Sequence, residues 1–368
     1  MKIVNKIAVV LSMTALLIGC NYSHKGYIKT DPEFKKQWYL YNDGQGKDVE
    51  IDKDFCSVTV FSEGVDIDCM GIWETSESLD FSKEIVVAII DTGVDYEHEE
   101  LKEVMWVNEK EIPDDGIDND GNGYVDDIYG WNFCEETGDI KDYSEEYYEN
   151  DHGTMCAGII AAKHNGIGIE GISRNGNVKI MSLKVLSGLS KKGITTNIVK
   201  AIKYAESMGA EICNMSFNIT GEECEELERS VMNSDMLFVV SAGNDGKNID
   251  EYRSFPASYK FGNLITVGNL DSTGGLYEES NWGCDSVDIL APGTNIYSCV
   301  VNGYGYDTGS SMSTPMVTGV AAMLWLKHEE WDSIEIKNCI LRHSDHKKEL
   351  FSKVRNGTIL NGGNVLHK

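Results

Sequence analysis

Short runs of apolar, often β-branched residues alternate along this chain with segments that carry the periodicity of amphipathic helices. Such runs are typical of strands buried on both faces, because helices cover both sides of a parallel sheet. Strands are predicted at residues 84–90, 178–186, 211–217, 236–240, 264–268 and 287–290, and helices at 195–208, 222–233, 312–327 and 331–343. The alternation predicts an α/β fold with a mainly parallel, twisted sheet and right-handed crossovers.

Ligands bind such sheets beyond the carboxyl ends of the strands, so functional residues are expected there. Asp91 stands where the first apolar run stops, ahead of Thr-Gly. Alone it is either a turn residue or a functional carboxylate. His152 directly precedes a helix of small apolar residues. A lone histidine is often structural, but a helix N-terminus disfavours imidazolium, and a neutral ring is what a general base needs.

A third segment, GSSMSTP, is predicted to open a helix, with Pro315 tolerated in its first turn. A serine there has backbone N–H groups beside it that can stabilise an oxyanion. The alternative is an ordinary capping serine in a loop. Spacing alone does not select among the four hydroxyls of Ser310, Ser311, Ser313 and Thr314.

Taken together, these segments occur in the order Asp, His, Ser, which is the order of the subtilisin triad. IIDTGVD, HGTMCAG and GSSMSTP each resemble an active-site motif of bacterial subtilisin-like serine proteases. The resemblance runs from about Asp31 to the C-terminus, and includes the lead-in DPEFKKQWYL and the closing NGGNVL. It implies a three-layer subtilisin-like fold and a serine endopeptidase that hydrolyses peptide bonds through an acyl-enzyme.

The same resemblance assigns roles to individual residues. Ser311 would be the nucleophile, His152 its general base and then general acid, and Asp91 the group that orients the imidazole. The segment FVVSAGND resembles the oxyanion-hole segment of the family, which makes Asn244 the side-chain donor; by itself Asn244 would be a turn residue.

Substrate contacts are expected from two further segments. NMSFN resembles the strand that pairs with an extended peptide substrate, and its last three residues are Ser216, Phe217 and Asn218. The family usually has Gly where this chain has Asn218, so the pocket is either narrowed or approached differently. Ser254 aligns with the pocket floor. Asp245 at the rim would favour a basic side chain, and the specificity stays open.

Acidic residues gather beside the predicted site, since residues 91–151 hold 22 Asp or Glu against 3 Lys. Within them, oxygen-bearing side chains at alternate positions, with Gly sixth, match the first half of an EF-hand calcium loop. Position 12 is Tyr129, so the loop is not an EF-hand. The expected calcium ligands are Asp118, Asp120, Asn122 and either Asp127 or Asp126. A solvated acidic loop is the alternative. Residues 163–171 resemble another calcium loop of the family, with Asn165 and Glu100 as possible ligands.

The N-terminus reads as a targeting signal. Lys2 and Lys6 precede an apolar run over residues 7–18, which is too short for a membrane-spanning helix. The run ends in Leu-Ile-Gly-Cys20, which resembles a bacterial lipoprotein cleavage box. Residues 1–19 are therefore predicted to be a signal peptide, 20–30 a short linker and 31–368 the peptidase domain, with 31–83 as its lead-in. Cys20 would anchor the enzyme by lipid to the outer face of the membrane. Ordinary secretion is the alternative.

The charge balance excludes one class of partner. The 60 acids outnumber the 32 Lys and Arg, for a formal charge of −28, whereas nucleic-acid binding needs clustered positive charge. A monomer that acts on extended peptide or protein is expected. Three hypotheses follow: a broad endopeptidase, a dedicated maturation protease for one exported peptide such as a bacteriocin leader, and an inactive calcium-binding surface protein.

One of the 10 cysteines stands out by its position. Cys156 lies one helical turn after His152, on the same face of the predicted helix. It is either a packed thiol or a group beneath the catalytic imidazole, where mercurials would slow the enzyme.

Overall fold

The computed structural model describes residues 29–44, 61–77, 79, 82–141, 151–174, 176–187, 194–220 and 223–368. The predicted signal peptide, Cys20 and most of the predicted linker lie outside these residues. Within the part of the chain that the structure describes, no helix is long and apolar enough to cross a membrane.

The described residues form a sheet of nine strands in the order β12-β13-β9-β8-β6-β4-β1-β3-β2. Its strands are β1 (Ile85–Asp91), β2 (Gly130–Asn132), β3 (Val178–Lys184), β4 (Ile212–Met215), β6 (Leu237–Ser241), β8 (Leu264–Leu270), β9 (Ile289–Pro292), β12 (Asp345–His346) and β13 (Thr358–Ile359). The strands pair in parallel except β12 with β13 at one edge. The mainly parallel α/β sheet predicted from the sequence is confirmed.

The helices of the described chain are α1 (Cys69–Ser76), α2 (Asp151–Ala161), α3 (Ile194–Ser207), α4 (Glu225–Met232), α5 (Ser310–Lys327), α6 (Ser333–His343) and α7 (Gly362–Leu366), with 3-10 turns η1 (Phe34–Lys36), η3 (Lys348–Leu350) and η4 (Arg355–Gly357). Two short antiparallel pairs complete it: β5 (Ile219–Thr220) with β7 (Ser254–Phe255), and β10 (Ile296–Val300) with β11 (Gly303–Asp307).

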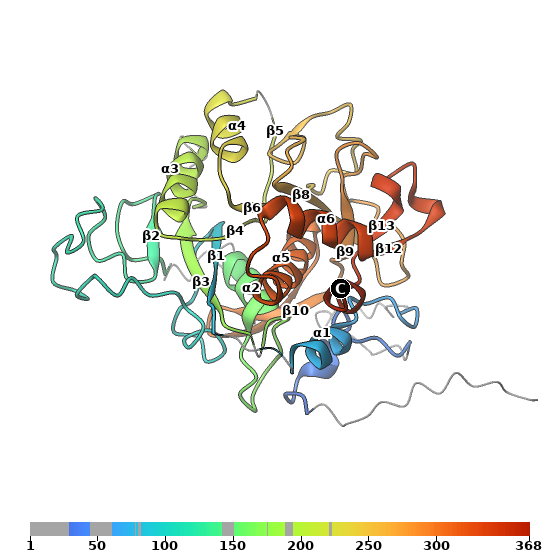
Figure 1. Cartoon of the computed structure of the whole chain (residues 1–368), viewed down its shortest axis with the longest axis horizontal. Helices are drawn as coiled ribbons and strands as arrows, with labels where there is room; N and C mark the ends of the chain where they lie inside the picture. The colour runs from blue at the N-terminus through green and yellow to red at the C-terminus, as the bar shows by residue number, and fades with distance from the viewer. Residues whose placement is uncertain are drawn as a thin grey trace, which may run out of the picture.

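The helices form layers on both faces of the sheet (Figure 1). All seven residues of β1 are buried. Ile85, Val87 and Ile89 join the core that contains α2 and α5. The residues between them, Val86, Ala88 and Ile90, join the core under α3 and α4. This alternation follows from the period of two along a strand, and it explains why the strand is apolar from Ile85 to Ile90.

Parallel pairing places the carboxyl ends of β1, β4 and β6 on the same side of the sheet. Met215 is paired with Val240, one residue before the end of β6. The N-terminus of α5 lies at these carboxyl ends, since the Ser310 hydroxyl is 2.8 Å from that of Ser241. The loops that follow these strands therefore meet at the start of α5, where the predicted site residues lie.

The described parts of the lead-in pack into the same core. Trp38, Tyr39, Leu40 and Trp73 are almost fully buried in the core shared with α2 and α5. The Trp73 indole also donates to the carbonyl of Ile172 at 2.9 Å. These aromatic anchors tie the segment before β1 to the body of the domain.

Two of the differences from the sequence prediction lie close to the predicted site. The strand predicted to end at Phe217 ends at Met215, because the Ser216 hydroxyl is drawn to the start of α5. The β10–β11 hairpin was not predicted, since β11 reads Gly-Tyr-Gly-Tyr-Asp and has no apolar run.

Candidate active site

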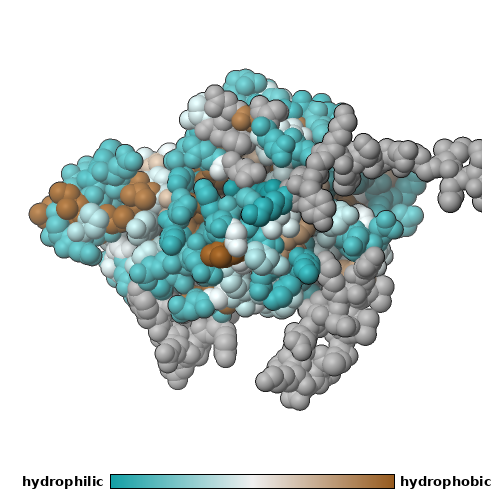
Figure 2. All heavy atoms as spheres, turned by 90° about the horizontal axis from the view of Figure 1, so that it is seen from below, coloured by the Kyte–Doolittle hydropathy of each residue, from teal (hydrophilic) through white to brown (hydrophobic). Residues whose placement is uncertain are grey.

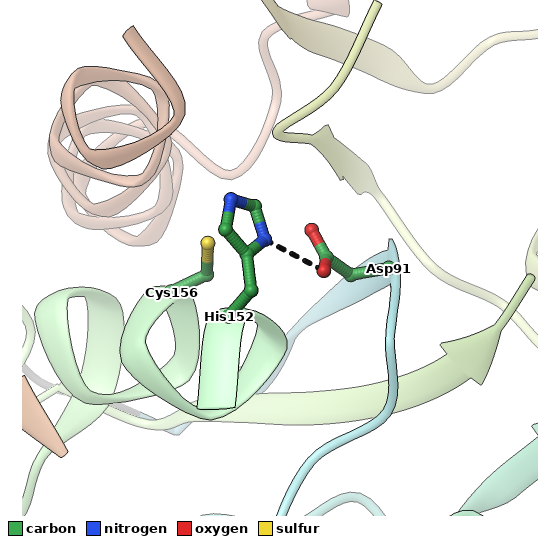
Figure 3. A group of neighbouring side chains, drawn as sticks. All are labelled: Asp91, His152 and Cys156. Carbon is green, nitrogen blue, oxygen red and sulfur yellow. Dashed lines mark hydrogen bonds and ion pairs between the residues drawn. The ribbon is translucent and has the colours of Figure 1, made fainter. Parts of the chain in front are cut away.

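The side chains of Asp91 and His152 are joined by a hydrogen bond. His152 Nδ1 lies 2.8 Å from Asp91 Oδ1. The Asp91 side chain is wholly buried at the end of β1, and that of His152, in the first turn of α2, is 25% exposed. Figure 3 shows the other ring nitrogen of His152 pointing away from Asp91. The carboxylate therefore fixes the ring orientation and leaves that nitrogen available.

The charge environment of His152 favours its protonated form. Burial lowers the pKa of the imidazole, but the charge and hydrogen bond of Asp91, together with the charge of Asp307, outweigh burial and raise the pKa of His152 above its ordinary value. The helix N-terminus was expected to keep the ring neutral. The nearby carboxylates have the larger effect because they are full charges, whereas a helix end carries about half a charge.

The four hydroxyls that the sequence could not distinguish have different environments. Ser310, Ser313 and Thr314 are fully buried. Their hydroxyls donate inward, to Asn244 Oδ1, the Ala291 carbonyl and the Ser310 carbonyl, at 2.9, 2.8 and 2.8 Å respectively. Ser311 is partly exposed. Of the four, it is the one that can meet a substrate.

Ser311 is placed next to α2 by contacts beneath it. The Ser216 hydroxyl donates to the Ser311 carbonyl at 2.8 Å, and the Cys156 thiol lies 3.8 Å from the same oxygen. Cys156 is one turn after His152, and the potential ligand atoms of Asp91, His152 and Cys156 lie within 4.8 Å of one another. Figure 3 shows the thiol beside the imidazole. The start of α5 thus lies against the turn of α2 that follows His152.

The amide of Asn244 is held in one orientation. Its Oδ1 accepts from the backbone N–H of Ser310 at 2.8 Å and from the Ser310 hydroxyl at 2.9 Å. Gly309 packs so closely that an added Cβ would lie 3.0 Å from Asn244 Nδ2. Because the amide oxygen is occupied, the exposed amide nitrogen is the group presented beside Ser311.

The predicted substrate-contacting residues separate into two groups. Ser216 is buried and supports the start of α5, and Phe217 is half-buried against the core under α3. Asn218 and Ser254 are bonded to each other, with Asn218 Nδ2 to Ser254 Oγ at 2.8 Å. Asp245 is exposed, and its backbone N–H donates to Asn281 Oδ1. The Ser216 hydroxyl therefore supports the start of α5, whereas the side chains of Asn218 and Asp245 reach solvent.

The described residues 108–127 of the acidic segment form a lobe on the β2 side of the sheet (Figure 1). Ile112, Ile117 and Val125 are exposed apolar side chains among its acids. Figure 2 shows hydrophobic side chains among hydrophilic ones on a projecting lobe.

Three carboxylates in this lobe, from Glu111, Asp118 and Asp120, have oxygens within 4.8 Å of one another. Asp118 and Asp120 were predicted ligands, and Glu111 was not. Asn122 instead donates its amide to Asp127 at 2.9 Å. Asp127 also accepts from Asn108 and the Tyr204 hydroxyl, so its oxygens already serve as internal acceptors.

The loop over residues 163–171 contains a second group of charged side chains. The Asn165 amide donates to Glu100 at 3.0 Å, and burial raises the pKa of Glu100 to about 7. The oxygens of Asp31 and Glu170 lie within 4.8 Å of a His164 nitrogen. Arg174 donates to the same Glu170 carboxylate at 2.7 Å. A guanidinium in this group offsets the negative charge that a metal ion would otherwise neutralise.

Sequence reasoning missed two contributors to these sites. Glu111 stands seven residues before Asp118, outside the recognised loop pattern. Asp307 acts on His152 through charge from the hairpin that was not predicted. Spacing along the chain carries no signal for either residue. Ser216 was predicted as a substrate contact, and the structure adds that its hydroxyl supports Ser311.

Comparisons with known proteins agree with this arrangement. A profile of the subtilase family (Peptidase S8) matches residues 82–359. The major intracellular serine protease of Bacillus subtilis is 33% identical over 253 residues, which are 67% of this chain and 70% of that protein. The thermophilic serine proteinase of a Bacillus species is 35% identical over 266 residues, covering 70% of this chain and 56% of its own length. Subtilisin-like protease 1 of Plasmodium berghei is 32% identical over 307 residues, which cover 75% of this chain and 48% of that protein. The chain thus spans about half the length of the latter two.

Solved structures share the fold at lower sequence identity. A protease from Pseudoalteromonas arctica superposes with a TM-score of 0.68 over 92% of this chain and 98% of its own, at 21% identity. A cold-adapted subtilisin-like serine proteinase superposes with a TM-score of 0.59 over 88% of this chain and 97% of its own, at 23% identity. The similarity in structure supports the fold, and the profile match over most of the sequence shows that the chain belongs to the subtilase family.

Proposed function

We propose that this protein is a serine endopeptidase in which Ser311 is the nucleophile, His152 the general base and Asp91 the residue that orients the imidazole. The observation that carries the proposal is the 2.8 Å bond between Asp91 and His152 in a member of the subtilase family. Ser311 is supported as the nucleophile by its exposure, since the neighbouring hydroxyls are buried and donate inward.

In the proposed mechanism the Ser311 oxygen attacks the peptide carbonyl while His152 takes the hydroxyl proton. The negative charge on the carbonyl oxygen would be stabilised by Asn244 Nδ2 and by backbone N–H groups at the start of α5. His152 then gives the proton to the leaving amine, which departs and leaves an acyl-enzyme. Water, deprotonated by the same imidazole, then attacks the acyl carbon; the ester bond to Ser311 breaks, and His152 gives the proton to the serine oxygen. Asp91 stays ionised and stabilises the imidazolium at each step.

The proposal is tested by covalent labelling with a fluorophosphonate, which reacts with an activated serine. The wild type should be labelled and Ser311→Ala should not. Ser313→Ala is the matched control, because Ser313 is buried and donates to Ala291 instead of facing the site. Labelling that persists in Ser311→Ala, or that is absent from folded wild type, would refute the assignment.

We also propose a structural calcium ion in the acidic lobe, held by Glu111, Asp118 and Asp120. Hard carboxylate oxygens suit calcium, and three carboxylates with oxygens within 4.8 Å of one another form a group that a cation would neutralise. Neutralisation of these carboxylates is the chemistry that the ion would supply. The ion has no part in peptide hydrolysis.

The cellular placement is proposed from the sequence. A signal that ends in Leu-Ile-Gly-Cys20 supports a lipid anchor at the outer face of a bacterial membrane. Metabolic labelling with an alkynyl fatty acid should mark the wild type and not Cys20→Ser. A wild type without label would leave ordinary secretion as the better account.

A further inference from the structure

The side chain of Asn218 lies between the two segments that flank Ser311. Its Nδ2 donates to Ser254 Oγ at 2.8 Å. The same amide lies against Gly243, where an added Cβ would be 2.7 Å from Asn218 Nδ2 and 2.9 Å from Cγ. Ser254 is 2% exposed, whereas Asn218 is partly exposed. The amide therefore covers Ser254 from the solvent side.

Both flanking segments are fixed relative to the nucleophile. Ser216, two residues before Asn218, donates its hydroxyl to the Ser311 carbonyl at 2.8 Å. Gly243 directly precedes Asn244, whose amide oxygen binds Ser310. Since these contacts anchor both walls to the start of α5, the Asn218 amide lies in the gap between the walls rather than on a separate surface.

The gap adjoins the place where the attacked carbonyl must lie. In the proposed mechanism the carbonyl carbon meets Ser311 and its oxygen meets Asn244. The side chain of the same substrate residue starts next to that carbon, and the space beside Gly243, the residue before Asn244, is the neighbouring space that it would enter in this mechanism. That space holds the Asn218 amide.

The position of Gly243 limits how the gap could widen. Its φ is +98°, a conformation that side-chain-bearing residues rarely adopt. Asn281 braces the same turn, because its amide donates to the Ala242 carbonyl at 2.9 Å and its oxygen accepts from Asp245 N at 3.1 Å. A large substrate side chain would therefore have to displace Asn218 and leave the buried Ser254 hydroxyl without this bond, which disfavours it.

We propose that Asn218, anchored by Ser254, closes this recess and restricts the enzyme to small side chains, Gly, Ala or Ser, on the acyl side of the cleaved bond. The inference rests on the proposed serine endopeptidase function and adds the substrate class to it. Asn218 is a specificity-determining residue here and takes no part in proton transfer.

The experiment compares kcat/KM for a peptide series that varies only at the acyl-side residue. Wild type should cleave the Ala peptide about 10-fold or more faster than the Leu or Phe peptides, the scale on which a pocket discriminates by size. Asn218→Gly should raise the Phe-to-Ala ratio by about 10-fold or more. Ser254→Ala should raise the Phe-to-Ala ratio by less. This variant removes the hydrogen bond that holds the Asn218 amide, but the amide itself still occupies the gap. Asn233→Gly, the same change at an exposed helix end, should leave the ratio unaltered.

The outcomes separate this inference from the proposed function. A wild type that prefers Leu or Phe overturns the inference, and this result needs no variant to fold. An Asn218→Gly protein that is labelled by fluorophosphonate but keeps the wild-type ratio overturns it as well, while the endopeptidase proposal stands. Folded wild type that neither cleaves nor is labelled overturns the proposed function, and the inference with it.

Discussion

Asp91 and His152, 61 residues apart in the chain, share a hydrogen bond of 2.8 Å at the carboxyl end of β1. The bond joins a fully buried carboxylate to a ring that still reaches solvent. Because the carboxylate accepts the hydrogen bond, the ring is held in the tautomer that carries its proton on Nδ1.

Replacing Asp91 by Asn should lower kcat by about 10⁴-fold, the loss that the equivalent change causes in a chymotrypsin-type protease. An amide at this position can donate to Nδ1, which would place the ring proton on the nitrogen needed as the base. Steady-state kinetics on a peptide ester, with thermal melting to verify folding, measures the effect. A folded variant that keeps a tenth of wild-type turnover would contradict the assigned role.

Activity should fall as the pH drops through the pKa of His152, since only the neutral imidazole accepts the serine proton. The charge of Asp307 helps to raise this pKa. Asp307→Asn should therefore lower the pKa and shift the acidic limb of the kcat/KM profile to lower pH. Asp235→Asn is the matched control, because Asp235 is exposed just before the amino-terminal end of β6, whereas the catalytic residues lie at the carboxyl ends of the strands. Superimposable profiles for Asp307→Asn and wild type would show that this charge does not reach the imidazole.

The two ends of the Asn244 amide can be tested separately. Asn244→Asp keeps an oxygen to accept from Ser310 but loses the amide donor, and Asn244→Ala loses both. Each should lower kcat by about 100- to 1,000-fold with little change in KM, as loss of this donor does in subtilisin. If Asn244→Asp were nearly as active as wild type, the amide would serve only to hold Ser310.

Mercurial reagents should slow the enzyme through Cys156. Its thiol lies 3.3 Å from the Ser216 hydroxyl, so a mercury atom bound there would disturb the support of Ser311. The reaction should be slow, because the thiol is buried and burial raises its pKa. Cys156→Ser should resist the reagent. Cys284→Ser, which removes an exposed thiol, should remain as sensitive as wild type. Equal inhibition of wild type and Cys156→Ser would place the effect elsewhere.

Calcium should raise the melting temperature of the wild type. At a calcium concentration 100 times the Kd, the free energy of unfolding should rise by about 2.7 kcal/mol. Glu111→Gln and Asp118→Asn should lose most of this gain. Asp114→Asn, at an exposed site in the same lobe, should keep it. Differential scanning calorimetry in calcium and in chelator provides the comparison, and identical melting curves in the two would argue against the ion.

The sheet could be predicted because burial on both faces leaves a local record. Six of the seven residues of β1 are apolar, up to Asp91 at its end, and β6 begins with four apolar residues. β11 could not be predicted, since its residues are polar or Gly and only pairing with β10 makes it a strand. Glu111 was missed for a related reason: the chain folds back to bring it to Asp118, and no fixed spacing encodes that return.

The sequence by itself determined the order of the motifs, the strands that carry them and the family, because each is written in contiguous residues. Spacing left four hydroxyls equivalent, so that only the family resemblance pointed to Ser311, and the substrate pocket stayed undefined. Only the tertiary structure made Ser311 the exposed one and put Asn218 across the gap to Ser254. Burial and contact between distant segments decided both, and these are properties of packing that a local pattern does not contain.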